Sequence, residues 1–266
     1  MAIHPTAVVD PSAELGDVNV GAYSVIGPGV TLHDGVDIAH HVVIYGHTEI
    51  GEGSAVHAFA CIGGDPQDLK YQGETTSLLI GRNNIIREYV TLNRGTVQGG
   101  GVTRIGDNNL FMACTHVAHD CVVGDGCVFA NSTALAGHVS VGDYAIFGGL
   151  SGVHQFCRVG RRAMVAAGAM AALDVPPFSI AQGDRARLFG LNIVGLKRAG
   201  YTTEQIAIMR RAWRELFSRS SPMAIAMDKV REAWGELPEA LEMVDFIEGS
   251  RRGVCRAATS PDIGIE

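Results

Sequence analysis

Large apolar residues recur at every sixth position through most of the first two thirds of the chain. One run of this kind extends from Val20 to Ile62 and another from Ile105 to Ala171. The fifth place of each hexad is usually small or β-branched, and the second is often glycine. A fixed six-residue period is typical of parallel β-helices, in which each hexad supplies one short strand and one corner. We expect the first and fifth places to face the interior, and second-place glycines to form sharp corners.

Two polar segments, residues 65–79 and 98–104, interrupt the six-residue pattern. Insertions in a solenoid project as loops, and loops often carry functional residues. The pattern ends near Pro176, which predicts an all-β parallel β-helix domain over residues 1–185. A glycine-rich β-sandwich with a chance period is the alternative, but so long an unbroken register disfavours it.

Helical signals begin after the repeat. Thr202 and Gln205 form a capping-box pattern, and the apolar residues that follow recur at helical spacing. Ser221-Pro222 and Leu237-Pro238 mark the starts of two further helices. Residues 186–266 are therefore predicted to form a small α-helical C-terminal domain.

Composition narrows the possible functions of the 266 residues. The net charge of −7 disfavours non-specific binding to nucleic acid. The N-terminus lacks a basic segment followed by a long apolar run, and no stretch of about 18 apolar residues occurs. We expect no signal peptide, no transmembrane segment and a cytoplasmic location. The six cysteines form no CxxC pair, so a zinc ribbon is not indicated.

Three histidines, His116, His119 and His138, lie within one part of the repeat. If residues roughly 18 apart stack on successive coils, His119, Gly137 and Gln155 form one column. Asp120 adjoins His119 in the chain. The same column reaches the point where the first loop leaves the repeat.

Three explanations of this cluster remain open. The side chains could be ordinary polar residues at an exposed corner. The three histidines could bind zinc, as histidines do in the hexapeptide-repeat carbonic anhydrases of the γ class. Alternatively, His119 could act as a general base oriented by Asp120, while the Gly137 N–H stabilises an oxyanion. The last explanation requires no metal or cofactor and no cysteine nucleophile.

Several short segments carry a family resemblance along nearly the whole chain, in the order QDLKY, RGTVQGGG, AHDC, LAGHVSV, VHQF, DVPP and GLKR. The chain resembles the bacterial UDP-N-acetylglucosamine O-acyltransferases. Members transfer a 3-hydroxyacyl chain from acyl carrier protein to the sugar 3-hydroxyl, the first step of lipid A biosynthesis. The resemblance implies a left-handed β-helix, a homotrimer with sites between neighbouring prisms, and no cofactor.

The resemblance also assigns roles by position. His119 corresponds to the catalytic base, Asp120 to its partner and Gly137 to the oxyanion donor. The implied sugar, phosphate and acyl contacts are Asp68, Lys70, His116, His138, His154 and Gln155. Asn192 and Arg198 correspond to nucleotide contacts, and Ala167 to the residue that limits acyl length.

Three positions depart from the family pattern. Asn93 replaces a histidine, Val194 replaces an acidic residue and Ala199 replaces an arginine. These differences leave open whether the acceptor is UDP-N-acetylglucosamine or its 3-amino analogue. The methyl group of Ala167, where the family has glycine, is expected to shorten the preferred chain.

An acidic carrier protein requires a basic surface, and the candidates are Arg158, Arg161, Arg162, Arg210, Arg211 and Arg214. The related N-acyltransferase of the same pathway is a weaker alternative, because it has an additional domain before its repeat. A purely structural solenoid is the third possibility, and it predicts no activity that depends on His119.

Overall fold

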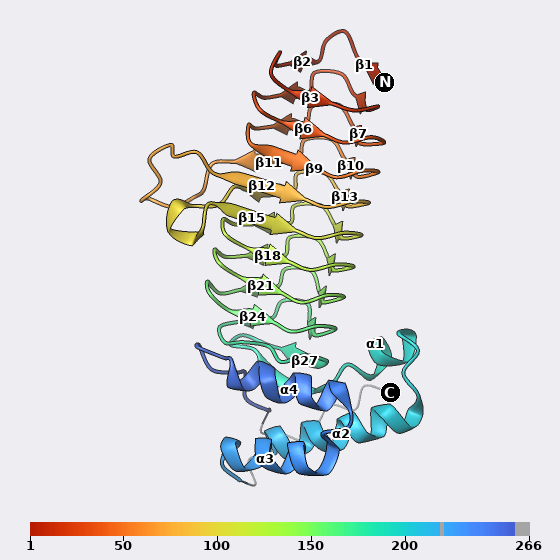
Figure 1. The fold of residues 1–266 in the computed structure, drawn as a ribbon, viewed down its shortest axis with the longest axis vertical. Helices are drawn as coiled ribbons and strands as arrows, with labels where there is room; N and C mark the ends of the chain where they lie inside the picture. Colours follow the sequence, from red (N-terminus) through yellow and green to blue (C-terminus); the bar gives the residue numbers. More distant parts are fainter. Residues whose placement is uncertain (219–220, 259–266) are drawn as a thin grey trace.

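The computed structural model describes residues 1–218 and 221–258 and contains a parallel β-helix with helices gathered at its C-terminal end (Figure 1). Strands on successive coils pair in parallel register, as in Val122 with Ser140 and His116 with Ala134. On these coils partners are 18 residues apart, and on the first coil they are 17 apart, as in Ala2 with Asn19, which confirms the predicted β-helix.

Three sheets form the walls of the prism. The first contains β1 (Ala2–Ile3), β4 (Asn19–Val20), β7 (Asp37–Ile38), β10 (Ala55–Val56), β13 (Ile85–Ile86), β16 (Leu110–Phe111), β19 (Val128–Phe129), β22 (Ile146–Phe147), β25 (Met164–Val165), β27 (Ser179–Gln182) and β28 (Arg187–Leu191). The second contains β2 (Val8–Val9), β5 (Val25–Ile26), β8 (Val43–Ile44), β11 (Cys61–Gly64), β14 (Thr91–Asn93), β17 (His116–Val117), β20 (Ala134–Leu135), β23 (Gly152–Val153) and β26 (Met170–Ala171). The third contains β3 (Glu14–Leu15), β6 (Thr31–Leu32), β9 (Thr48–Ile50), β12 (Ser77–Ile80), β15 (Val102–Ile105), β18 (Val122–Val123), β21 (Ser140–Val141) and β24 (Arg158–Val159).

The prism interior is filled by the first and fifth places of the hexads. Phe111, Phe129 and Phe147 are fully buried and stack on successive coils, with ring centroids 4.8 and 4.6 Å apart. Cys121 and Cys127, at the fifth place, are also fully buried. Repeating side chains of matched size thus form continuous interior columns, as close packing requires.

Glycine at the second place has a different role from the one expected. The left-handed residue of each corner is the fourth one, such as His138 at φ 61° and Phe156 at φ 65°. At most of these corners the fourth-place N–H donates to the coil before it, as from His138 to the His119 carbonyl at 3.0 Å, which offsets the cost of this conformation. Second-place glycine instead permits close stacking, because a Cβ on Gly142 would lie 2.7 Å from the backbone nitrogen of Arg161.

Both insertions form loops that project from the same side of the prism (Figure 1). The first leaves after Gly64 and returns at Ser77, so residues 77–79 belong to β12 rather than to the loop. The second contains the short 3-10 helix η1 (Val97–Gly99) and ends before Val102, so residues 102–104 belong to β15. Pairing of β12 with both β9 and β15 draws these residues into the third sheet.

The C-terminal part adds a hairpin and four helices. Strands β27 and β28 pair antiparallel and continue the first sheet, so this hairpin spans the expected boundary at residue 185. The helices are α1 (Ile193–Arg198), α2 (Thr203–Phe217), α3 (Met223–Trp234) and α4 (Pro238–Glu248).

The starts of α2, α3 and α4 confirm the predicted helical signals, including the capping box of Thr202 and Gln205. The hairpin and α1 were not predicted. The last residues of the expected helical domain, 259–266, lie outside the described residues. In the described part of the chain, no helix is both long and apolar enough to cross a lipid bilayer.

Candidate active site

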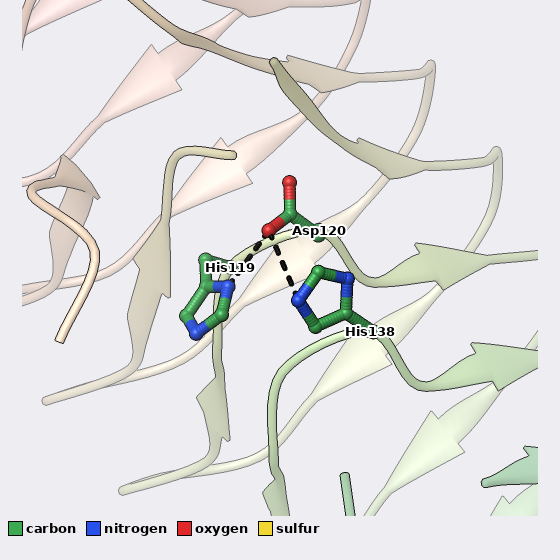
Figure 2. Close-up of side chains that lie close together, drawn as sticks. All are labelled: His119, Asp120 and His138. Atoms are coloured by element: carbon green, nitrogen blue, oxygen red, sulfur yellow. Dashed lines mark hydrogen bonds and ion pairs between the residues drawn. The ribbon is translucent and has the colours of Figure 1, made fainter. Parts of the chain in front are cut away.

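His119 and Asp120 occupy the corner that joins β17 to β18. Asp120 is the fourth residue of its hexad, and its φ of 59° turns the carboxylate back toward the neighbouring imidazole. Asp120 Oδ2 lies 2.8 Å from His119 Nδ1 (Figure 2). Because an ionised carboxylate only accepts hydrogen bonds, the proton lies on Nδ1 and the lone pair on Nε2. Asp120 thus orients its chain neighbour His119 so that Nε2 is the atom able to accept a proton.

The Asp120 carboxylate is fixed by Thr96, the residue that caps η1 at the start of the second loop. Its Oδ1 accepts a hydrogen bond from the Thr96 N–H at 2.8 Å, and Oδ2 accepts one from the Thr96 hydroxyl at 2.6 Å. The Asp120 N–H donates to the Thr103 hydroxyl at 2.8 Å. Only 1% of the Asp120 side chain is exposed, so these bonds replace water almost completely. The sequence analysis did not identify Thr96 or Thr103; Thr96 lies in the RGTVQGGG segment that supported the resemblance.

His138 lies one coil further along the same corner. Its Nε2 is 3.5 Å from Asp120 Oδ2, and its ring stands perpendicular to that of His119, with centroids 5.1 Å apart. Phe156, on the next coil, stacks on His138 with centroids 4.5 Å apart. Burial lowers the pKa of His138 below its ordinary value, partly opposed by the charge of Asp120. His138 is therefore a largely neutral neighbour of the base.

Gly137 faces the His119 ring, as the stacking argument predicted. A Cβ on Gly137 would lie 2.6 Å from His119 Cε1 and 2.7 Å from Nε2, which no real Cβ could tolerate. Within the described residues, the Gly137 N–H donates no hydrogen bond. Gly137, whose N–H has no acceptor among these residues, therefore packs directly against the His119 ring, and a free backbone donor near the base is suited to stabilising an oxyanion.

A groove of about 1130 Å³ runs along the outer face of the second sheet beside this corner. Seven of the predicted site residues line it: Asp68, Lys70, His116, His119, Gly137, His154 and Gln155. The backbone N–H of Lys70 donates to the Asp68 carboxylate at 3.0 Å, which orders the tip of the first loop over the groove. One chain thus brings the loop and the corner together.

Five predicted residues do not line this groove: Asp120, which is buried behind His119, and His138, Ala167, Asn192 and Arg198. Ala167 is exposed at the corner between the first and second sheets. Asn192 is buried, where its side-chain oxygen caps α1 by accepting from the Gly195 N–H, and its amide donates to the Arg162 carbonyl. Arg198 is exposed at the end of α1. The site predicted from sequence is thus only partly assembled within one chain.

Comparison with known proteins identifies the family of the chain. Residues 174–255 match the family model described as UDP N-acetylglucosamine O-acyltransferase, domain 2, and residues 103–137 match that of the bacterial transferase hexapeptide repeat. An acyl-(acyl-carrier-protein)–UDP-N-acetylglucosamine O-acyltransferase from Xanthomonas euvesicatoria is 49% identical over 96% of this chain and 97% of its own. A protein of the same name from Thermodesulfovibrio yellowstonii is 46% identical over 96% of this chain and 99% of its own. The chain belongs to this acyltransferase family.

Solved structures support the assignment. LpxA from Acinetobacter baumannii superimposes with a TM-score of 0.94 at 43% identity, covering 96% of this chain and all of that one. LpxA from Moraxella catarrhalis gives a TM-score of 0.94 at 41% identity, with 96% and 100% coverage. The protein is therefore an acyltransferase with the fold of LpxA.

The positions that depart from the family resemblance have identifiable places in this acyltransferase. Asn93 is buried and donates from Nδ2 to the Asp65 carbonyl at 2.8 Å, which fixes the start of the first loop. Val194 is 55% exposed on α1, and Ala199 follows the last residue of that helix. Neither Val194 nor Ala199 lies in the groove of its own chain.

A metal could be accommodated by a different set of residues from the one considered in the sequence. Donor atoms of His119, Asp120 and His138 lie within 4.8 Å of one another. His116 is not part of this group, and its Nδ1 lies 2.7 Å from the Thr91 hydroxyl. Both oxygens of Asp120 already accept hydrogen bonds from Thr96. The arrangement fits a hydrogen-bonded carboxylate–imidazole pair better than a zinc centre, whose ligands would have to give up these bonds.

The buried cysteines are poorly suited to nucleophilic catalysis. Burial raises the pKa of Cys121, Cys127 and Cys255 to about 12 and that of Cys157 to about 11. A thiol is nucleophilic only as the thiolate, so these four side chains are inert at neutral pH.

Three arginines of the predicted basic surface are engaged in contacts within the chain. Arg161 binds both carboxylate oxygens of Glu242 on α4, and Arg158 binds Asp174 at 3.2 Å. Arg162 lies over the Tyr144 ring. Arg210, Arg211 and Arg214 are exposed on α2. Of the six candidate arginines, Arg210, Arg211 and Arg214 are therefore the ones that are both exposed and carried on a single helix.

Proposed function

We propose that this protein transfers a 3-hydroxyacyl chain from an acyl carrier protein thioester to the 3-hydroxyl of UDP-N-acetylglucosamine, the first step of lipid A biosynthesis. The names and near-complete coverage of its relatives support the substrates. The observation that carries the proposal is the juxtaposition of the His119–Asp120 pair with the unpaired N–H of Gly137 in one groove.

The chemistry follows from the orientation of the base. His119 Nε2 accepts the proton of the sugar 3-hydroxyl as its oxygen attacks the thioester carbonyl carbon. The Gly137 N–H donates to the oxygen that becomes negative, and Asp120 stabilises the imidazolium. Collapse of the tetrahedral intermediate expels the thiolate of the donor, which takes the proton back from His119. The acyl group passes directly between substrates, so no covalent enzyme intermediate and no cofactor are required.

The remaining groove residues bind the substrates. Asp68 and Lys70 approach from the loop, while His116, His154 and Gln155 extend from the second sheet. Because Asn192, Arg198 and Ala167 lie outside their own groove, we assign them to the groove of a neighbouring copy, where Ala167 limits acyl length. We further propose, from the family resemblance, that the copies form a homotrimer and that it acts in the cytoplasm.

The decisive test uses purified protein, defined acyl carrier thioesters and both UDP-sugars, with products identified by mass. We expect acylated UDP-N-acetylglucosamine, and at least a thousandfold loss of kcat in His119→Ala. The matched control is His33→Ala, which removes an exposed imidazole that lies 2.8 Å from Glu49 and outside the groove. If His119→Ala kept a tenth of the activity, if only the 3-amino sugar were acylated, or if a chelator abolished turnover, the proposal would be wrong.

The shared site has its own test. Mixed assemblies of His119→Ala and Arg198→Ala chains should regain activity, because some grooves would receive both native residues. Light scattering should give the mass of three chains. A monomer that is fully active would contradict this part of the proposal.

A further inference from the structure

The end of the groove furthest from the loop is formed by two arginines, Arg185 and Arg252, with Asp184 beside them. Its floor there is β26, the last strand of the second sheet. None of these three side chains has a part in the acyl transfer described above. They come from different segments, the hairpin turn and the chain after α4, and both segments meet at β26.

Backbone hydrogen bonds hold both arginines at this strand. The Met170 N–H donates to the Gly183 carbonyl at 3.0 Å, and the Ala186 N–H donates to the Met170 carbonyl at 2.8 Å. Arg185 is therefore carried on a turn that is tied to β26 on both sides. Arg252 Nη2 donates to the Ala172 carbonyl, immediately after the strand, at 3.4 Å.

Arg185 forms no ion pair with any described residue, and Arg252 is only partly engaged, by the Ala172 carbonyl and by the buried Cys157 thiol. The Nε of Arg252 is buried and has no hydrogen-bond partner among the described residues. No ion pair within the described part of the chain involves Arg185, Arg252 or Asp184. Two guanidinium groups and one carboxylate leave this end positive, with several free N–H groups. Such groups bind phosphate oxygens well, because guanidinium donors match their geometry.

We propose that Arg185 and Arg252 bind the phosphate that joins the donor's thioester-bearing arm to its carrier protein. The assignment rests on the proposed function. The Gly137 N–H and the carbonyl that Arg252 contacts are two coils apart, roughly 10 Å. Between them the groove is lined by Gly152, Val153, Met170 and Ala171, together with His154 and Gln155, and by no lysine, arginine or carboxylate of the described residues. A pantetheine arm is uncharged between thioester and phosphate, and is long enough to cover this distance.

The diphosphate of the acceptor offers the same chemistry, so the experiment separates the two sources. Acyl-phosphopantetheine and acyl-pantetheine, which lacks the phosphate, are compared as donors for the wild type and for Arg185→Gln and Arg252→Gln. We expect the wild type to prefer the phosphorylated donor at least tenfold in kcat/KM. Each substitution should remove most of this preference and leave the KM for UDP-N-acetylglucosamine unchanged. Arg187→Gln, an exposed arginine of the same hairpin outside the groove, is the control.

Three results would overturn the inference. The first is a wild type that does not distinguish the donors. The second is a pair of variants that keep the preference. The third is a rise confined to the KM for the UDP-sugar, which would assign the arginines to the nucleotide. Thermal unfolding of each variant checks that it is folded. If Arg252→Gln is unstable, Arg185→Gln still tests the inference, because Arg185 is exposed. Failure of the wild type to use intact acyl carrier protein would instead refute the proposed function.

Discussion

Replacing Asp120 by asparagine tests the central pair with almost no change in shape. The amide oxygen can still accept from the Thr96 N–H, but the amide nitrogen then faces His119 as a donor. His119 is forced into the tautomer that carries its proton on Nε2, where it cannot accept one from the sugar. We expect kcat to fall steeply while both KM values change little, because Asp120 does not line the groove.

The size of the loss follows from the geometry. In the transition state the imidazole becomes positive, and its charge centre lies roughly 4 Å from the Asp120 carboxylate. At an effective dielectric constant of about 20, this attraction is about 4 kcal/mol. Its loss corresponds to about a thousandfold in kcat. Burial of the Asp120 side chain, 1% exposed, means that water cannot replace the missing charge.

Steady-state kinetics with saturating acyl carrier thioester measure this effect. Asp125→Asn is the matched control, because that exposed carboxylate accepts the Asp107 N–H at 2.7 Å on another corner of the prism. A kcat within threefold of the wild type, in a variant with unchanged thermal unfolding, would refute the assigned role of Asp120.

Two further predictions concern the neighbours of His119. Gly137→Ala should lower kcat about a hundredfold, because its Cβ would meet His119 at 2.6 Å. In the control Gly149→Ala the Cβ would lie 3.3 Å from the nearest atom, and kcat should change little. NMR titration should place the pKa of His138 below 6.5, since burial disfavours its charged form. The unfolded chain then binds this proton more readily, so the free energy of unfolding should decrease as pH falls below about 6.5, and less so in His138→Gln. Equal acid sensitivity of the variant and the wild type, or an active Gly137→Ala, would contradict these expectations.

Much of the architecture was predictable because its causes are local. The six-residue period places one side chain in each interior column, and this repeats wherever the register is unbroken. The pairing of His119 with Asp120 needed only adjacency, and its position beside Gly137 needed only the stacking distance. The capping box at Thr202 likewise involves residues of a single turn.

Other features depend on contacts between distant segments, which the six-residue period does not predict. Asp120 is held by Thr96, which reaches it only because the second loop folds back beside the corner. The loop ends were misplaced because β12 and β15 recruit polar residues by pairing with each other. Arg161 was expected to be a surface residue, but Glu242, far along the chain, binds it.

The sequence by itself determined the coil, its interior and the corner on which the base lies, because each arises from neighbours or from a constant spacing. The tertiary structure alone decided which groups lock Asp120, how the hairpin extends the first sheet, and that Arg185 and Arg252 meet at one end of the groove. These depend on segments brought together by packing across insertions, and their spacing along the chain follows no rule that the repeat could supply.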